Sequence, residues 1–435
     1  MTNARRDGLT LVLLGSAIFV FLGAALEHMS PFAMMDFKVV YYSARCLAQH
    51  CDPYNESELV RSYKAEGGEN PTDSPKVLST VRIYVYQPNA FAITVPLALL
   101  PYSIAHIVWI ALTLGSLVLA SYLAWDLGAD YAPILSGCLV FLILANSELL
   151  AIVGNAAGIV VSLSVASAWC FLRQRHAIAG VICLGVALAL KPQDSGFVWL
   201  SFLLAGGLHR KRAMQALGVA CALSLPAVLW VWHVAPHWLA ELRTNLAAVS
   251  ARGANIDPGP TSSGAHGLGS VTDLQAAISL IRDDPRFYNP ASYILSACLL
   301  VPWLIKSVRS PKSRAGAGLA LAAIAPLTML PFYHRQYDAK LLLLAVPACA
   351  MVFAERRAVR WLALGATSIA IVLNGDFFWA ILLNVITGVQ LPPTPFWIRT
   401  LIAVQALPAP LALLLMTVVW VWIYCRRPLG DSSAG

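Results

Sequence analysis

Charged side chains are scarce in this sequence. Only 12% of its 435 residues are Asp, Glu, Lys or Arg, whereas 58% are hydrophobic, and the mean hydropathy is +0.69. A soluble globular protein has about 25% charged residues. With so few charges a soluble fold could not cover its own surface, so the composition excludes a soluble enzyme and predicts an all-α polytopic membrane protein.

The net charge of +8 does not indicate a nucleic-acid partner, because the basic residues occur in short clusters between apolar runs. Such clusters mark the cytoplasmic loops of membrane proteins. They stand at Arg5/Arg6, Arg173/Arg175, 209–212, 306–314, 355–360 and Arg426/Arg427. They predict cytoplasmic termini and place two long loops, 28–83 and 235–290, on the opposite side. We expect residues 1–435 to form one membrane domain.

Thirteen apolar runs can be counted, but two cytoplasmic termini require an even number of spans. The runs cover residues 9–26, 84–100, 103–125, 131–149, 152–172, 177–190, 195–208, 214–233, 291–306, 316–332, 339–354, 361–380 and 398–424. Either 84–100 or part of 177–208 is expected not to span, since a span needs ~20 residues. Two half-helices that meet at Lys191-Pro192-Gln193-Asp194 would place polar groups inside the bundle.

Metal-binding patterns are missing. Six of the nine Cys are scattered within apolar runs, where they act as small hydrophobic residues. Cys46 and Cys51 both fall in the first long loop, and either a disulfide or two free thiols fits that position. No spacing of Cys or His resembles a zinc site, so we expect no metal and no cofactor.

The sequence also lacks inverted repeats, which counts against a transporter. The second long loop has a Gly/Pro/Ser-rich centre at 253–269, flanked by helix-like stretches at 238–249 and 271–281. A mobile lid and a plain connector both fit this composition. Residues 154–158 are glycine-rich, but no strand–turn–helix unit surrounds them, so they do not predict a nucleotide site.

Asp36 begins an amphipathic stretch, 36–49, which predicts a helix along the membrane surface. A carboxylate at the mouth of an apolar cavity can act as a general base toward a hydroxyl group. A solvated loop aspartate is the alternative, and taken in isolation the commoner one.

A second polar cluster, Tyr333-His334-Arg335-Gln336-Tyr337-Asp338-Ala339-Lys340, lies between two apolar runs. Cationic and hydroxyl groups at a helix end suit recognition of a phosphate, although an interfacial anchor of snorkelling side chains fits equally. Lys191 is a third candidate, unless it only forms a private pair with Asp194. Asn374-Gly375-Asp376 is more typical of a loop cap than of a site.

Several of these residues, taken in order, resemble a known family. Asp36-Phe37 with Tyr41-Tyr42-Ser43-Ala44-Arg45 and Asp52-Pro53-Tyr54 is similar to the "DF…YY.A…PY" opening of glycosyltransferase family 87 (DUF2029). Tyr84-Val85-Tyr86-Gln87-Pro88, Pro96–Pro101, Lys191-Pro192, and Tyr333-His334 with Asp338 resemble its later motifs. The similarity covers about residues 9 to 400. The family's "GQ.N" motif is replaced here by Gly154-Asn155-Ala156-Ala157.

The resemblance implies a GT-C-type bundle of about 12–13 transmembrane helices in the cell (inner) membrane, with short surface helices in the external loops. It implies an inverting, metal-independent mannosyltransferase that uses a polyprenyl-phosphate-sugar donor and a lipid or glycan acceptor outside the cytoplasm. Asp36 would be the general base. His334, Arg335, Lys340 and Lys191 would bind the donor phosphate, and Tyr41, Tyr42, Tyr86, Tyr337 and Asp338 would contact the substrates. The helices and the stretch after Asp36 would enclose the polyprenyl tail.

Two other classes remain as alternatives. A lipid-linked-sugar flippase would use the same cationic cavity, but it would need access from both sides of the membrane. An inactive scaffold for envelope assembly would explain the altered 154–157 motif.

Overall fold

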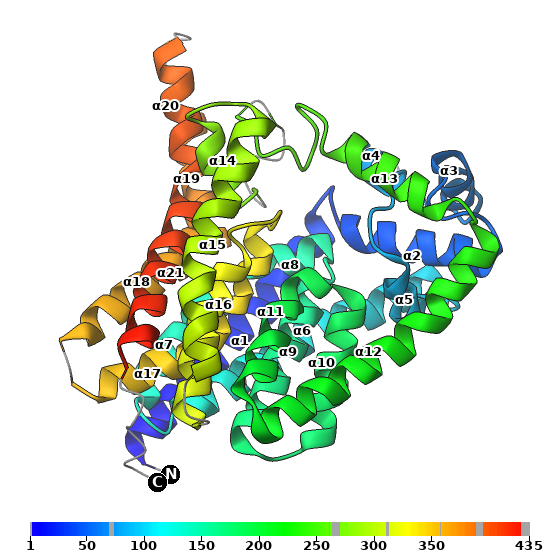
Figure 1. Cartoon of the computed structure of the whole chain (residues 1–435). Helices are drawn as coiled ribbons and strands as arrows, with labels where there is room; N and C mark the ends of the chain where they lie inside the picture. Colours follow the sequence, from blue (N-terminus) through cyan, green and yellow to red (C-terminus); the bar gives the residue numbers. More distant parts are fainter. Residues whose placement is uncertain are drawn as a thin grey trace.

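The computed structural model describes residues 2–68, 74–260, 262, 270–309, 313–356, 358–388 and 395–427. These residues form helices joined by short connections, and the described part contains no β-strand (Figure 1). The all-α prediction is confirmed.

The α-helices of the first half are α1 (Asn3–Met29), α2 (Met35–Ala48), α3 (Glu56–Ala65), α4 (Pro75–Val81), α5 (Phe91–Ala98), α6 (Tyr102–Gly128), α7 (Pro133–Leu144), α8 (Glu148–Val153), α9 (Ala157–Arg173), α10 (Ala177–Leu190) and α11 (Pro192–Ala205). Those of the second half are α12 (Gly207–Val234), α13 (Trp238–Val249), α14 (Leu274–Ser279), α15 (Pro285–Arg309), α16 (Arg314–Thr328), α17 (Val346–Ala354), α18 (Val359–Leu373), α19 (Asp376–Gly388), α20 (Pro395–Ala406) and α21 (Pro408–Arg426). Two 3₁₀-helices are η1 (Pro88–Ala90) and η2 (Gln336–Ala345).

Six helical segments among the described residues are long and apolar enough to cross a membrane, and the bent pair α18–α19 makes up to seven. The six are α1, α6, α12, α15, η2–α17 and α21. Other apolar helices, such as α7, α9, α10 and α16, have only 10–17 residues. The chain is therefore a polytopic membrane protein, while the count of 12–13 spans stays a prediction.

Helix breaks interrupt the chain in three regions of apolar sequence, two of them expected from the sequence and one not. Residues 84–100 contain only η1 and the short α5, and 177–208 divides into the 14-residue helices α10 and α11. The expected helix break at Lys191-Pro192 is thus confirmed, while the expectation that one run does not span the membrane stays a prediction. The run 398–424, expected to be one span, is split between α20 and α21, because Pro408 begins a new helix there.

The predicted surface helix, 36–49, corresponds to α2, but most of α2 is buried instead of lying exposed on a membrane surface. Helices α3, α4 and α5 pack against it. Phe37 stacks on Trp109 with ring centroids 4.8 Å apart, so the apolar side faces protein. Cys46 and Cys51, at and just beyond its end, form a disulfide. Helices α3–α5 cover α2, and for this reason α2 is buried and does not lie exposed at the membrane surface as expected.

The start of α1 and the end of α21 lie at the same end of the molecule (Figure 1). Ion pairs gather the basic residues there: Arg5 contacts Asp126 at 3.0 Å, Arg173 contacts Asp126 at 2.8 Å, and Arg314 contacts Asp130 at 3.2 Å. Because α1 crosses the bundle from this end, α2 begins near the opposite end. The clusters that the sequence assigned to one side of the membrane therefore do share one end of the fold.

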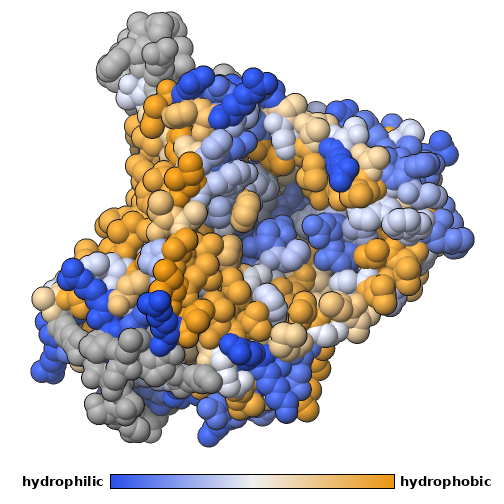
Figure 2. Space-filling view, viewed as in Figure 1, coloured by the Kyte–Doolittle hydropathy of each residue, from blue (hydrophilic) through white to orange (hydrophobic). Residues whose placement is uncertain are grey.

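The face seen in Figure 2 is hollowed between α14–α15 and α12–α13. Hydrophilic surface lies inside the hollow, and hydrophobic surface lies along its flanks. Helix α11 lies between these walls and packs against α12, α15 and α16. Helix α11 therefore lies behind the hollowed face, between its two walls.

Close backbone approach fixes α1 against α7. A Cβ atom added to Gly8 would lie 2.3 Å from the carbonyl oxygen of Pro133, and one added to Gly137 would lie 2.5 Å from that of Gly8. Small residues at such positions let membrane helices pack closely. Gly8 and Gly137 thus set the position of the first helix.

We predict that Gly8→Val lowers the free energy of unfolding by about 1–3 kcal/mol, because the added methyl groups would overpack a backbone contact. Gly115→Ala on α6 is the matched control, since a Cβ there meets nothing within 4 Å. Thermal unfolding in detergent measures both, and equal stabilities for the two variants would contradict the close-approach model.

Candidate functional site

Polar residues from five separate parts of the chain meet at one site. They come from the start of α2, the segment before η1, the turn between α8 and α9, the α10–α11 break, and the segment that leads into η2. The residues are Asp36, Tyr86, Asn155, Lys191, Asp194, Tyr333, His334, Arg335, Tyr337 and Asp338.

Asp36 is partly exposed, and its Oδ2 accepts a hydrogen bond of 2.8 Å from Asn155 Nδ2. Burial raises the pKa of the Asp36 carboxyl, while the Asn155 hydrogen bond and the charges of Arg335 and Lys191 lower it. The net pKa lies above the ordinary value, which suits a group that must accept a proton near neutral pH.

A tight turn holds Asn155 against α2. Gly154 has φ of +65°, and a Cβ there would lie 2.4 Å from Met34 Sδ. The backbone N–H of Met34 donates to Ile152 at 2.7 Å, and Trp109 Nε1 donates to the Gly154 carbonyl at 2.8 Å. Only glycine allows both this conformation and this approach.

Lys191 lies at the break between α10 and α11, where its backbone is extended with φ of −150° and ψ of 81°. The following Pro192 disfavours helical backbone at Lys191 and begins α11. The ammonium group contacts Asp338 Oδ1 at 2.5 Å and Asp194 Oδ2 at 2.9 Å. Lys191 therefore does not form an isolated ion pair with Asp194, because Asp338 of η2 supplies a second carboxylate.

His334 is buried, and its Nε2 lies 3.3 Å from Asp194 Oδ1. Its Nδ1 lies 2.9 Å from the carbonyl oxygen of Phe332, which favours an N–H at this position. Burial alone would lower the pKa of His334, but the contact with Asp194 outweighs it, so the pKa is raised. The imidazolium form is thereby favoured.

Arg335 joins the site to the second long loop. Its guanidinium donates to the Tyr333 hydroxyl and to Asn255 Oδ1, the latter at 2.9 Å. Its backbone pairs with Val271 in an isolated antiparallel bridge, and its N–H donates to Asp338 Oδ2 at 2.7 Å. Residues 270–274 are thus paired with the segment that carries His334 and Arg335. Residues 261 and 263–269 lie outside the described residues, so the lid hypothesis is untested.

The tyrosines predicted to contact substrate divide into two groups. Tyr86 lies close enough to Lys191 and Asp36 for their charges to influence its pKa, and the Tyr337 hydroxyl accepts from Asn155 at 3.1 Å. Tyr41 instead donates to the Leu100 carbonyl at 2.7 Å, and Tyr42 stacks on Tyr102. The latter two lie in the aromatic packing beneath α2.

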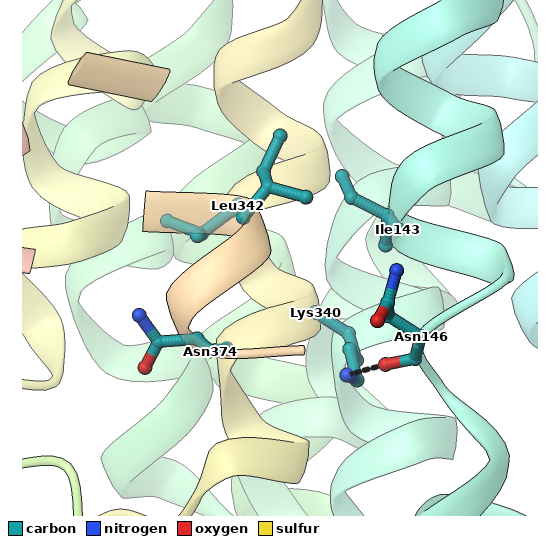
Figure 3. A pocket seen from close by; sticks show the side chains of 7 residues that line it. Ile143, Asn146, Lys340, Leu342 and Asn374 are labelled. Carbon is teal, nitrogen blue, oxygen red and sulfur yellow. Dashed lines mark hydrogen bonds between the residues drawn. The ribbon is translucent and has the colours of Figure 1, made fainter. Parts of the chain in front are cut away.

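Lys340 faces a different set of partners. Its ammonium group is directed at the carbonyl oxygen of Asn146 (Figure 3) and lies 3.5 Å from Asp376 Oδ1. Asp376 Oδ2 also accepts from the N–H of Leu149 at 2.7 Å. A cavity of about 10 Å³ beside Lys340 and Asn374 has room for one water molecule. Lys340 therefore connects η2 to the α7–α8 and α18–α19 breaks.

Two buried site residues escaped the sequence reasoning. Asn155 was noted only as a departure from a motif, although a Gly-Asn pair between apolar runs is a helix-break signal. Asp273 is buried, its Oδ1 accepts from Ala276 N–H at 3.1 Å, and burial raises its pKa to about 7. Its nearness to His334 depends on the pairing of the second loop with residues 330–336, which no local pattern predicts.

Residues 84–279 match the model of Glycosyltransferase family 87. The matched part is somewhat less than half of the chain and is similar to glycosyltransferase family 87. It includes Tyr86, Asn155, Lys191, Asp194 and Asp273 of the site, and it confirms the family resemblance. No curated protein and no solved structure matches the chain.

The match supports a glycosyltransferase, a class of enzyme that uses a sugar donor and an acceptor. Within the described residues, no group of three or more His, Cys, Asp or Glu side chains could hold a metal ion.

We predict that Lys340→Met lowers the free energy of unfolding by about 3–5 kcal/mol, because it leaves the buried Asp376 carboxylate without its cation. Lys340→Met combined with Asp376→Asn should recover most of that loss. Denaturation of the single and double variants measures the coupling. Strictly additive losses would show that the two residues act independently.

Proposed function

We propose that this family 87 glycosyltransferase moves a hexose, mannose by family resemblance, from a polyprenyl-phosphate-linked donor to a hydroxyl group of a lipid or glycan. The observation that carries the proposal is the meeting of a partly exposed carboxylate, Asp36, with three cationic side chains from distant parts of the chain. These are Lys191, His334 and Arg335.

Asp36 acts as the general base in this mechanism. Its carboxylate takes the proton of the acceptor hydroxyl while that oxygen attacks the anomeric carbon from the face opposite the phosphate. The new C–O bond forms as the bond to the phosphate oxygen breaks, so the configuration inverts. The polyprenyl phosphate leaves with the bonding electron pair. A general base of this kind contributes about 10²–10⁴-fold to the rate.

The cations stabilise negative charge that develops on the leaving phosphate. Arg335 is the first candidate, since its guanidinium can contact two phosphate oxygens and lies close to Asp36. Lys191 already contacts Asp338, and His334 already contacts Asp194. These two cations therefore stabilise the phosphate mainly through the electrostatic potential at the site. Lys340 is directed at Asp376 and Asn146, and we do not include it among the phosphate ligands.

We infer that the site faces the extracytoplasmic side. The basic residues that mark cytoplasmic loops gather at the end where α1 begins, and Asp36 follows the other end of that helix. The Cys46–Cys51 disulfide, close to Asp36 in the chain, is typical of an oxidising compartment.

A lipid-dissolved donor also agrees with the surface. The hollow in Figure 2 has hydrophilic surface inside and hydrophobic flanks, so a sugar phosphate could enter it while its tail stays in the lipid. Because the site takes residues from Asp36 to Asp338, we treat 1–435 as one domain.

The first test measures transfer from radiolabelled polyprenyl-phosphate-mannose to a lipid extract by purified protein. We predict that Asp36→Asn lowers the rate at least about 100-fold and leaves donor binding intact, because the amide cannot accept the proton. In the wild type, the rate should fall as the pH drops through the raised pKa of Asp36, so the acid limb lies above the ordinary Asp range.

Asp52→Asn is the control for the first loop, because an amide oxygen can still accept the N–H of Tyr54 as Asp52 Oδ1 does at 2.8 Å. Full transfer by Asp36→Asn would remove Asp36 as the base. Donor movement across vesicles without sugar transfer would favour the flippase instead.

A second prediction concerns the donor phosphate. Arg335→Ala should raise the dissociation constant of the donor more than that of the acceptor, by about tenfold or more, since a charged hydrogen bond contributes about 1.5–3 kcal/mol. Arg286→Ala, at an exposed position near the start of α15, is the control. Equal dissociation constants of the donor for the wild type and for Arg335→Ala would contradict the assignment of Arg335 to the donor phosphate.

A further inference from the structure

The Asn155 side chain is held at three points. Its Nδ2 donates to Asp36 Oδ2 at 2.8 Å and to the Tyr337 hydroxyl at 3.1 Å. Its Oδ1 accepts the backbone N–H of Ala157 at 2.8 Å, at the start of α9. Only 4% of Asn155 is exposed, so water does not replace these partners. Both amide protons and the carbonyl oxygen are therefore in use.

These contacts fix which end of the amide faces Asp36. A flipped amide would direct Oδ1 at the Asp36 carboxylate and direct Nδ2 at the N–H of Ala157, so an acceptor would face an acceptor and a donor a donor. The turn at Gly154, packed against Met34, prevents the backbone from moving away. Asp36 Oδ2 thus faces a donor of fixed direction.

The other oxygen of Asp36 is left for a ligand. Among the described residues, Oδ1 has no hydrogen bond, and Asp36 is partly exposed. A free carboxylate in such a setting can rotate about its Cβ–Cγ bond, which is a soft torsion. The Asn155 hydrogen bond restricts this rotation and so determines where Oδ1 points.

We propose that Asn155 is a positioning residue, which keeps Asp36 ionised and directs Oδ1 toward the acceptor hydroxyl. This inference rests on the proposed function, since it assigns Asn155 a part in the same reaction. A hydrogen bond to the charged form of a carboxyl group favours that form. Asn155 therefore opposes the effect of burial on Asp36.

Other charged and titratable groups face Asp36 as well. Arg335 and Lys191, from the η2 segment and the α10–α11 break, favour the carboxylate. Tyr333 and Tyr337, from the η2 segment, and Tyr86, from the segment before η1, also lie near Asp36. Burial raises the pKa of Tyr333 and of Tyr86, so both remain neutral at ordinary pH. Asn155 is the side chain that the structure gives as a direct hydrogen-bond partner of Asp36.

A purely structural role is the competing explanation, since Asn155 also accepts from the start of α9. The two roles differ in what Asn155→Leu does, because this change removes the amide donor and adds no charge. A positioning role predicts that the titration of Asp36 moves, whereas a purely structural role predicts that it does not. Asn155→Asp keeps an oxygen for Ala157 N–H and places a second carboxylate against Asp36, so its larger shift checks that residue 155 is in direct contact with Asp36.

The test follows the titration of Asp36 by the infrared band of its protonated carboxyl group, assigned by its loss in Asp36→Asn. We expect Asn155→Leu to move the titration to higher pH by roughly one unit, and Asn155→Asp to move it further. Asn374→Ala is the control, because Asn374 is also buried but donates to the Ala370 carbonyl at 2.9 Å. It should leave the titration unchanged.

The acid limb of the pH–rate profile for mannosyl transfer should shift in the same order, with an unchanged dissociation constant for the donor. An unshifted Asp36 titration in Asn155→Leu and Asn155→Asp would overturn the inference, and so would an equal shift in Asn374→Ala. If the wild type transfers no sugar, the proposed function fails, but the infrared titration still decides whether Asn155 controls Asp36.

Discussion

A cation inside a membrane protein must be matched by negative charge, and the Lys191 network meets this requirement. Burial of an unpaired ammonium group at low dielectric has a large unfavourable desolvation free energy. Lys191 lies between Asp194, three residues along the chain, and Asp338, from a distant part of it. His334 contacts Asp194 in turn, and the N–H of Arg335 donates to Asp338. Electrostatic pairing therefore holds the late polar segment against the broken helix.

Helix breaks make this pairing geometrically feasible. The extended backbone at Lys191 separates two 14-residue helices and directs the buried side chain toward η2. Opposite it, η2 is a 10-residue 3₁₀-helix, an unusual length for this conformation. At 3.0 residues per turn, Asp338 and Lys340 point about 120° apart, so Asp338 faces Lys191 while Lys340 faces Asp376. One short segment thus supplies charges to two separate clusters.

The sequence was sufficient for local features and insufficient for long-range pairing. Scarce charge and long apolar runs predicted the class, and Pro192 predicted the break at Lys191, because these depend on residues close in the chain. The second partner of Lys191 could not be predicted, since Asp338 is 147 residues away. The burial of α2 was missed for a similar reason, because an amphipathic pattern does not tell lipid from α3–α5.

The two long loops complete the site from different directions. The first supplies Asp36, and the second pairs its residues 270–274 with the backbone that carries His334 and Arg335. Helix α13 of the second loop also reaches the first, where Asn245 donates to the carbonyl oxygens of Tyr54 and Tyr84 at 3.0 and 3.1 Å. The positions of the proposed base and of the cations therefore depend on each other, because each loop is held in part by the other and by the same bundle. The proposed inverting transfer needs the base and the phosphate ligands on opposite sides of one anomeric carbon, so this mutual support is the property that the proposed reaction requires of the fold.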